Sequence, residues 1–300
     1  MRLHRKLIAG LALCLALTSS ALANENTEKA AQLFDQGLVV LAQGNFDGAM
    51  KAFAGAAKTD PANQNYKQHL ALVNRVKQVR AMNEKEQNVA LWTKQAESLR
   101  TFYMDYEVFA EALAIDQRRF KKLGTPATAV DLAESQLELG KNAESVKLLV
   151  GLDKAMATPR SDVLLGIGLA RLGKMDDAKA VAGNCAAQVD SKDLALLFDA
   201  ACLNSLVGNQ ELAAKQLTLT FEQTPPAQLV KAKTYAKKRH DLAGLTSAQY
   251  AGVWTVESKI KPAACGSAAG CGGCSKAGDA GGCSDEEKDG ADCGTEGTDS

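Results

Sequence analysis

The sequence has 300 residues with 35 basic and 35 acidic side chains, so its formal net charge is zero. The lysines are scattered rather than concentrated on one segment, which excludes the basic footprint of a nucleic-acid-binding protein. Apolar residues make up 46% of the chain and aromatic residues only 5%, and Ala and Leu dominate the apolar share. Because Ala and Leu are the strongest helix formers, the composition favours helices over sheets.

The first residues predict export. The basic stretch MRLHRK is followed by the apolar run LIAGLALCLAL and by Ala21-Leu22-Ala23. This order is typical of a secretory signal peptide, so we expect residues 1–23 to be cleaved off after Ala23 and the protein to be periplasmic or secreted. Neither this run nor any later one reaches the roughly 20 apolar residues that span a bilayer. Cys14 resembles a lipobox cysteine, although Leu13 replaces the small residue of that pattern, and lipidation stays an alternative.

Residues 30–63 carry a pattern of small and aromatic residues at helical spacing. Counted from Ala30 as position 1, position 8 is Gly37, 17 is Phe46, 20 is Ala49, 24 is Phe53, 27 is Ala56 and 32 is Pro61. Small side chains at a helix crossing let two backbones approach, and Gly44 with Asn45 can supply the turn between the helices. Pro61 then ends the second helix.

The same pattern recurs along the chain. The place of Ala49 is taken by Ala112, Ser145, Ala178 and Ala213, at steps of 63, 33, 33 and 35 residues. This period resembles the tetratricopeptide repeat (TPR), a pair of antiparallel helices of about 34 residues. The resemblance implies an all-α, right-handed solenoid of about five helix pairs and a capping helix over residues 24–260. The clearest repeats fall at about 30–63, 93–125, 126–158, 159–193 and 194–227.

Residues 62–123 depart from the repeat, since they contain neither Gly nor Pro. Their apolar residues keep a spacing of three to four, which predicts long helices broken near Asn83 rather than a loop. Aromatic residues gather at the end of this segment: Trp92, Phe102, Tyr103, Tyr106, Phe109 and Phe120. We interpret them as a core seam between helices.

The chain after Pro226 predicts a terminal element. Residues 227–245 form an amphipathic pattern ending near Gly244, which we interpret as a capping helix, and a shorter helix follows whose Tyr250 and Trp254 cover the last groove. From Lys261 the composition changes to Gly, Ala, Ser and acidic residues, with two lysines against eight acidic residues in 265–300. Such a tail cannot bury enough apolar surface to offset its chain entropy, so we expect residues 261–300 to be disordered unless they are cross-linked.

The tail holds most of the cysteines of the mature chain, at Cys265, Cys271, Cys274, Cys283 and Cys293. Disulfides are the usual state in an exported protein. A soft metal such as zinc is the alternative, because Cys271 and Cys274 form a CxxC pair, and an idle tail is a third. Outside the tail, Cys185 and Cys202 occupy repeat positions near helix contacts. They fit small buried residues, although a disulfide between them stays open.

No motif of an enzyme is present: the mature chain has two distant histidines, His69 and His240, and no nucleophile elbow, Walker loop or HExxH. We therefore expect no enzymatic activity and no catalytic residue. We also expect no resident cofactor apart from the metal alternative in the tail.

The TPR resemblance implies that repeat positions 2, 5, 9, 12 and 13 face a groove that holds a protein or peptide partner. The apolar residues there are Phe34, Leu38, Leu41, Val130, Leu137, Val163, Ile167 and Phe198. They predict an apolar or amphipathic ligand, with packing between repeats as the alternative. Two function classes follow: an exported interaction scaffold, or a metal-binding or thiol-redox protein acting through the cysteine tail.

Overall fold

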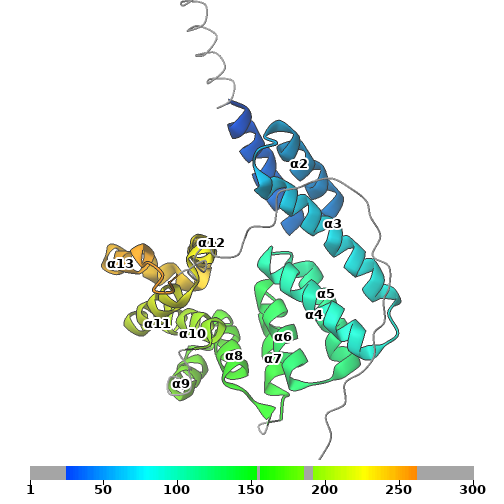
Figure 1. Cartoon of the computed structure of the whole chain (residues 1–300). Coiled ribbons are helices and arrows are strands. Elements are labelled where there is room, and N and C mark those ends of the chain that lie inside the picture. The colour runs from blue at the N-terminus through cyan, green and yellow to red at the C-terminus, as the bar shows by residue number, and fades with distance from the viewer. Residues whose placement is uncertain (1–24, 154–155, 186–191, 262–300) are drawn as a thin grey trace, which may run out of the picture. The chain divides into compact units, whose positions relative to one another are not determined.

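The computed structural model describes residues 25–153, 156–185 and 192–261, and within these ranges every regular element is a helix (Figure 1). A first helix covers 25–42. The helices that follow are α2 (Phe46–Thr59), α3 (Gln64–Lys85), α4 (Val89–Asp105), α5 (Phe109–Leu123), α6 (Pro126–Glu138), α7 (Asn142–Val150), α8 (Pro159–Arg171), α9 (Met175–Cys185), α10 (Leu194–Leu206), α11 (Gln210–Gln223), α12 (Pro226–Lys238) and α13 (Ala251–Thr255). Two 3-10 helices, η2 (His240–Thr246) and η3 (Ala248–Tyr250), precede α13.

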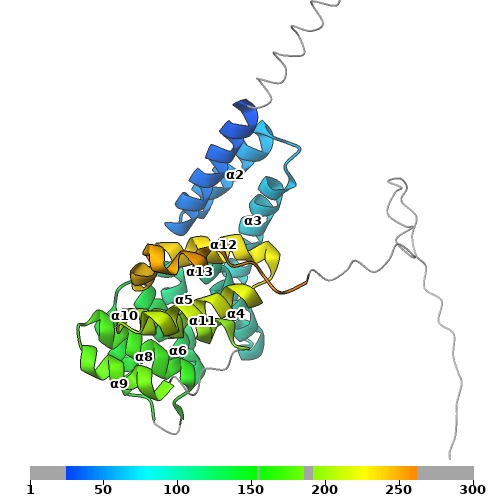
Figure 2. The same cartoon turned by 90° about the vertical axis from the view of Figure 1, so that its left-hand side faces the viewer.

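Consecutive helices pack as pairs, among them α6 with α7, α8 with α9 and α10 with α11. Figure 1 labels all six helices, and Figure 2 shows the last two pairs from another side. The turns inside four pairs share one geometry. Their glycines have positive φ, at 78° for Gly44, 71° for Gly140, 76° for Gly173 and 90° for Gly208. In each turn the residue after the glycine donates a backbone hydrogen bond to the carbonyl five residues earlier, as Lys141 does to Gln136 at 2.8 Å. This arrangement closes the first helix of the pair with a Schellman motif.

The small residues predicted at helix crossings are buried. Ala49, Ala112, Ser145, Ala178 and Ala213 are all 0% exposed. A side chain on Gly166 would place its Cβ 2.7 Å from Leu203 Cδ2, so α8 and α10 approach as closely as a glycine allows. Close packing of this kind leaves no room for larger residues. The core consists of two large apolar clusters, one over 41–115 and the other over 130–253, and a small third one near the first helix.

The segment without Gly or Pro forms the predicted long helices, and the chain leaves the helical path at residues 86–88. The break lies just after Asn83, which is 1% exposed and donates a hydrogen bond of 2.9 Å from Nδ2 to the Trp92 carbonyl. This bond ties α3 to the start of α4. In the aromatic cluster, Trp92, Phe102 and Tyr103 are buried. The remaining three, Tyr106, Phe109 and Phe120, are half-buried.

The predicted capping helix is shorter than expected. It does not continue to Gly244, because α12 ends at Lys238 and Arg239 has extended dihedral angles (φ −71°, ψ 116°). The chain then continues as the 3-10 helix η2. Trp254 of α13 donates from Nε1 to the Leu245 carbonyl at 2.9 Å, and its ring lies 6.1 Å from that of Phe221. The last helix therefore covers the end of α11.

Among the described residues, none of the helices combines the length and apolarity needed to cross a membrane. The predicted signal peptide and the tail from residue 262 onward lie outside the described residues.

Candidate functional site

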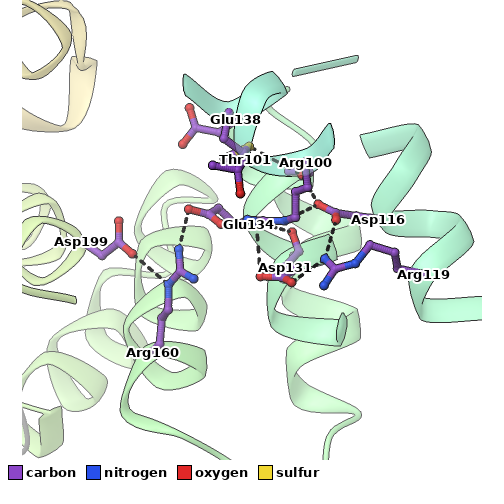
Figure 3. A network of polar contacts seen from close by, with 12 residues as sticks. Arg100, Thr101, Asp116, Arg119, Asp131, Glu134, Glu138, Arg160 and Asp199 are labelled. Atoms are coloured by element: carbon purple, nitrogen blue, oxygen red, sulfur yellow. Dashed lines mark hydrogen bonds and ion pairs between the residues drawn. The ribbon is translucent and has the colours of Figure 1, made fainter. Parts of the chain in front are cut away.

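Arginine and carboxylate side chains of α4, α5, α6, α8 and α10 form one polar network (Figure 3). Arg100 of α4 donates from Nε to Asp116 of α5 at 3.0 Å and also pairs with Glu134 of α6. Arg119 of α5 lies 2.6 Å from an oxygen of Asp131 of α6. These groups are largely buried, so each guanidinium is held by two or more carboxylates.

The network continues onto the next two helix pairs. Arg160 of α8 donates from a terminal nitrogen to Glu134 at 2.6 Å, and its Nε lies 3.5 Å from Oδ2 of Asp199 on α10. We call the surface formed by Arg100, Glu134, Glu138, Arg160, Arg171 and Asp199 the charged face. It extends from α4 to α10 because Arg100 pairs with Glu134, Glu134 pairs with Arg160, and Arg160 pairs with Asp199.

Asp199 is the least satisfied member of the charged face. Its side chain is 14% exposed, and neither its Oδ2 nor Arg160 Nε has a hydrogen-bond partner. Burial raises the pKa of Asp199 from the ordinary value of 3.8 to about 7, because Arg160 offsets only part of the cost of removing the charge from water. The charged form of Asp199 is therefore less favourable in the folded protein than in water.

Asp199→Asn should stabilise the protein at about pH 8. The folded pKa of Asp199 lies above the unfolded one, so the free energy of unfolding falls as the pH rises between about 4 and 7. The neutral amide should remove this part of the slope and raise the free energy of unfolding at about pH 8 by roughly 1–2 kcal/mol. Urea titrations near pH 5 and pH 8 measure both effects. Asp176→Asn, at an exposed position of α9, is the control, and a less stable Asp199→Asn protein at pH 8 would contradict this assignment.

A second group of ion pairs surrounds Asp241 of η2. Arg171 of α8 donates from Nε to one Asp241 oxygen at 2.9 Å and from a terminal nitrogen to the other at 2.5 Å. Arg239 donates to Asp241 at 2.9 Å and pairs with Glu138 of α6. Burial acts to raise the pKa of Asp241, but the hydrogen bonds and charges of the two arginines outweigh it and lower the pKa.

These residues line an open cleft of ≈ 400 Å³. Its wall contains charged groups of both signs together with apolar and amide side chains: Glu107, Phe109, Leu137, Glu138, Asn142, Arg171, Tyr235, Lys238, Arg239, His240 and Asp241. Oδ1 of Asn142 is buried without a hydrogen-bond partner. The cleft can therefore accept a polar segment that brings both donors and acceptors.

The structure buries most of the residues that the sequence predicted for a ligand groove. Leu41, Val130, Leu137, Val163 and Ile167 are 0 to 6% exposed. Phe34, Leu38 and Phe198 are half-buried. The eight residues do not form one surface, because the first three pack near the N-terminal core cluster and the others near the second. The five buried residues therefore fit the alternative that these side chains pack between repeats. A ligand cannot reach them in this structure.

The half-buried residues have aromatic neighbours. Phe34 lies 5.1 Å from Tyr66 and 4.8 Å from His69, measured between ring centroids. Phe198 lies 5.6 Å from Tyr235 of α12. Of these half-buried residues, Phe198 directly precedes Asp199, a member of the charged face.

Sequence reasoning missed the charged members of the site, although a signal for them was present. In the repeat numbering that selects Val130 and Leu137, positions 9 and 13 are Glu134 and Glu138. In the next repeat, positions 2 and 13 are Arg160 and Arg171. The sequence prediction considered only the apolar residues at these repeat positions, so it left out the charged side chains that line the charged face.

The cysteine predictions are resolved only in part. Cys265, Cys271, Cys274, Cys283 and Cys293 lie outside the described residues, and so does the metal or disulfide site proposed for them. Cys202 is free and 0% exposed, as expected for a small buried residue. Burial raises the pKa of its thiol well above the usual range, which keeps it protonated. Within the described ranges, no group of three or more His, Cys, Asp or Glu side chains is arranged to hold a metal ion.

Comparison with known proteins gives no family: no family model matches the chain, and no curated protein matches it either. The function we propose therefore depends on the sequence patterns and the geometry.

Proposed function

We propose that the protein is an exported, non-enzymatic scaffold of TPR-like helix pairs that binds a polypeptide segment across the charged face and its cleft. The observation that carries this proposal is the continuity of the face, which joins α4, α6, α8 and α10 through Arg100, Glu134, Arg160 and Asp199. A surface spread over several helix pairs fits an extended or helical ligand better than a small molecule.

Two features support a TPR-like array. The same glycine turn closes the first helix of four pairs, and the five small residues at the crossing position are all 0% exposed. An array built from such units needs no large aromatic core, which agrees with the low aromatic content.

The exposure pattern supports a polar ligand rather than an apolar one. Val163 and Ile167 are 0% and 1% exposed, whereas the neighbouring Arg160 is 27% exposed. A ligand on this side of α8 meets guanidinium and carboxylate groups first. Complementary charge of this kind gives specificity and orientation more than affinity.

Photo-crosslinking tests the proposal. Ala127 and Ala195 are exposed and lie one helical turn before Asp131 and Asp199, on the same side of α6 and α10. A photoreactive amino acid at either position should form a covalent adduct with the partner in the exported fraction.

The controls are Ala143 and Ala180, which are exposed on the second helices α7 and α9. We expect adducts from residues 127 and 195 and none from residues 143 and 180. Equal adducts from all four positions, or none from residues 127 and 195, would contradict the proposal.

A further inference from the structure

Helix α12 lies against the charged face, although it follows that face in the sequence. The ring of Tyr235 packs on Phe198 of α10, and Lys238 Nζ lies 3.0 Å from a carboxylate oxygen of Glu107, between α4 and α5. Directly after the helix, Arg239 pairs with Glu138 of α6. The helix therefore contacts the surface to which we assign ligand binding.

The other side of α12 contacts α11 and α13. Lys233 Nζ lies 5.8 Å from the ring centre of Phe221 on α11, and Lys237 Nζ lies 5.7 Å from that of Trp254 on α13. Within α12 only Ala236 is buried, and Val230 is 76% exposed. The helix thus contributes less to the apolar core than α10 does, with Ala236 inside the core and Leu229 and Ala232 packed against it.

The contacts between α12 and the charged face are complementary in charge. The side of α12 that faces these helices is basic. Its Lys231 lies 5.0 Å from the centre of the Tyr106 ring, and its Lys238 pairs with Glu107. The face supplies the carboxylates of Glu107 and Glu138. The Lys238–Glu107 pair is half-exposed, whereas the Arg239–Glu138 pair is largely buried. Because α12 has one buried residue and α10 has eight, α12 can open at a lower free energy than α10.

We propose that α12 occupies the binding surface as an intramolecular ligand. The partner then presents a basic helical segment with an aromatic residue four positions before an arginine, as Tyr235 precedes Arg239, and it binds by displacing α12. This inference rests on the proposed function, because it names the chemistry of the partner for the same surface. Because the partner binds only the molecules in which α12 is open, its apparent Kd equals the intrinsic Kd divided by the open fraction.

A labelled peptide of residues 226–241 tests the inference against the full chain. In the opened variant, Tyr235→Ala, Lys238→Ala and Arg239→Ala together remove the contacts with Phe198, Glu107 and Glu138, so that all three residues are free for the peptide. We expect this variant to bind the peptide at least about tenfold more tightly than the unaltered chain, measured by fluorescence anisotropy. The matched control, Gln228→Ala with Val230→Ala, changes exposed positions of the same helix and should bind like the unaltered chain.

Charge reversal in the peptide gives a specificity test. A peptide carrying Arg239→Glu should bind the opened variant at least about tenfold more weakly, because its carboxylate meets Glu138. Equal binding of both peptides, or equal binding to the opened variant and the unaltered chain, would overturn the inference.

Hydrogen exchange of the unaltered chain decides the matter if the opened variant does not fold. The amides of α12 should exchange at least about a hundredfold faster than those of α10, through local opening. Exchange of both helices at the rate of global unfolding would overturn the inference. Neither measurement uses a partner, so an inference that fails here leaves the crosslinking test of the proposed function unaffected.

Discussion

Replacing Val163 and Ile167 together by Glu should unfold the chain at room temperature. Both side chains lie in the second core cluster and are at most 1% exposed. Each carboxylate would enter an apolar site without a counter-ion, which costs several kcal/mol, whereas a folded domain is stable by only about 5–15 kcal/mol. The helical circular dichroism signal and its thermal transition measure the effect.

The matched control places two glutamates at exposed positions of neighbouring helices, Ala143→Glu and Ala180→Glu. This protein should melt within a few degrees of the unaltered chain, because exposed substitutions change stability by about 0.5 kcal/mol or less. If the Val163→Glu, Ile167→Glu protein kept its melting transition and lost only a partner, the two residues would be ligand contacts, and the buried arrangement described above would be wrong.

Asp241→Asn should lower the free energy of unfolding by about 3–5 kcal/mol. The Asp241 side chain is 3% exposed and holds two guanidinium groups, those of Arg171 and Arg239. An amide cannot neutralise either of them, so part of the charge stays buried without compensation. Because the folded pKa of Asp241 is lowered, its stabilisation is present above the ordinary pKa of 3.8 and is lost as the pH falls below it.

Urea unfolding of Asp241→Asn and of Asp47→Asn at neutral pH checks this prediction. Asp47 pairs with Lys77, but its side chain is 76% exposed, so its loss should change the free energy of unfolding little. An Asp241→Asn protein as stable as the Asp47→Asn protein would show that Asp241 does not hold the two arginines in solution.

The helix pairs were predictable because their signals are local. A glycine with positive φ ends a helix, and small residues at a fixed period mark the crossings, so Gly140, Gly173, Ala178 and Ala213 fall where the sequence predicts them. The end of α12 was less predictable. The pattern continues to Gly244, but Arg239 adopts an extended conformation, and its side chain pairs with Glu138 and Asp241.

The candidate site could be predicted only in part. Arg171 and Asp241 are 70 residues apart, and Arg239 and Glu138 are 101 apart, so no local pattern connects them. A repeat numbering indicates which side of a helix a residue occupies. It does not show whether an apolar residue such as Val163 is covered by the next helix pair, because coverage depends on how closely α8 and α10 approach.

Differential hydrogen exchange tests the central claim, that the partner binds on the charged face, most directly. The amides of α6, α8, α10 and α12 are compared with and without the partner captured through residues 127 and 195. We predict slower exchange in α6, α8 and α10, faster exchange in the displaced α12, and no change in α7 and α9. Protection confined to α7 and α9, or unchanged exchange in all of these helices, would contradict the claim.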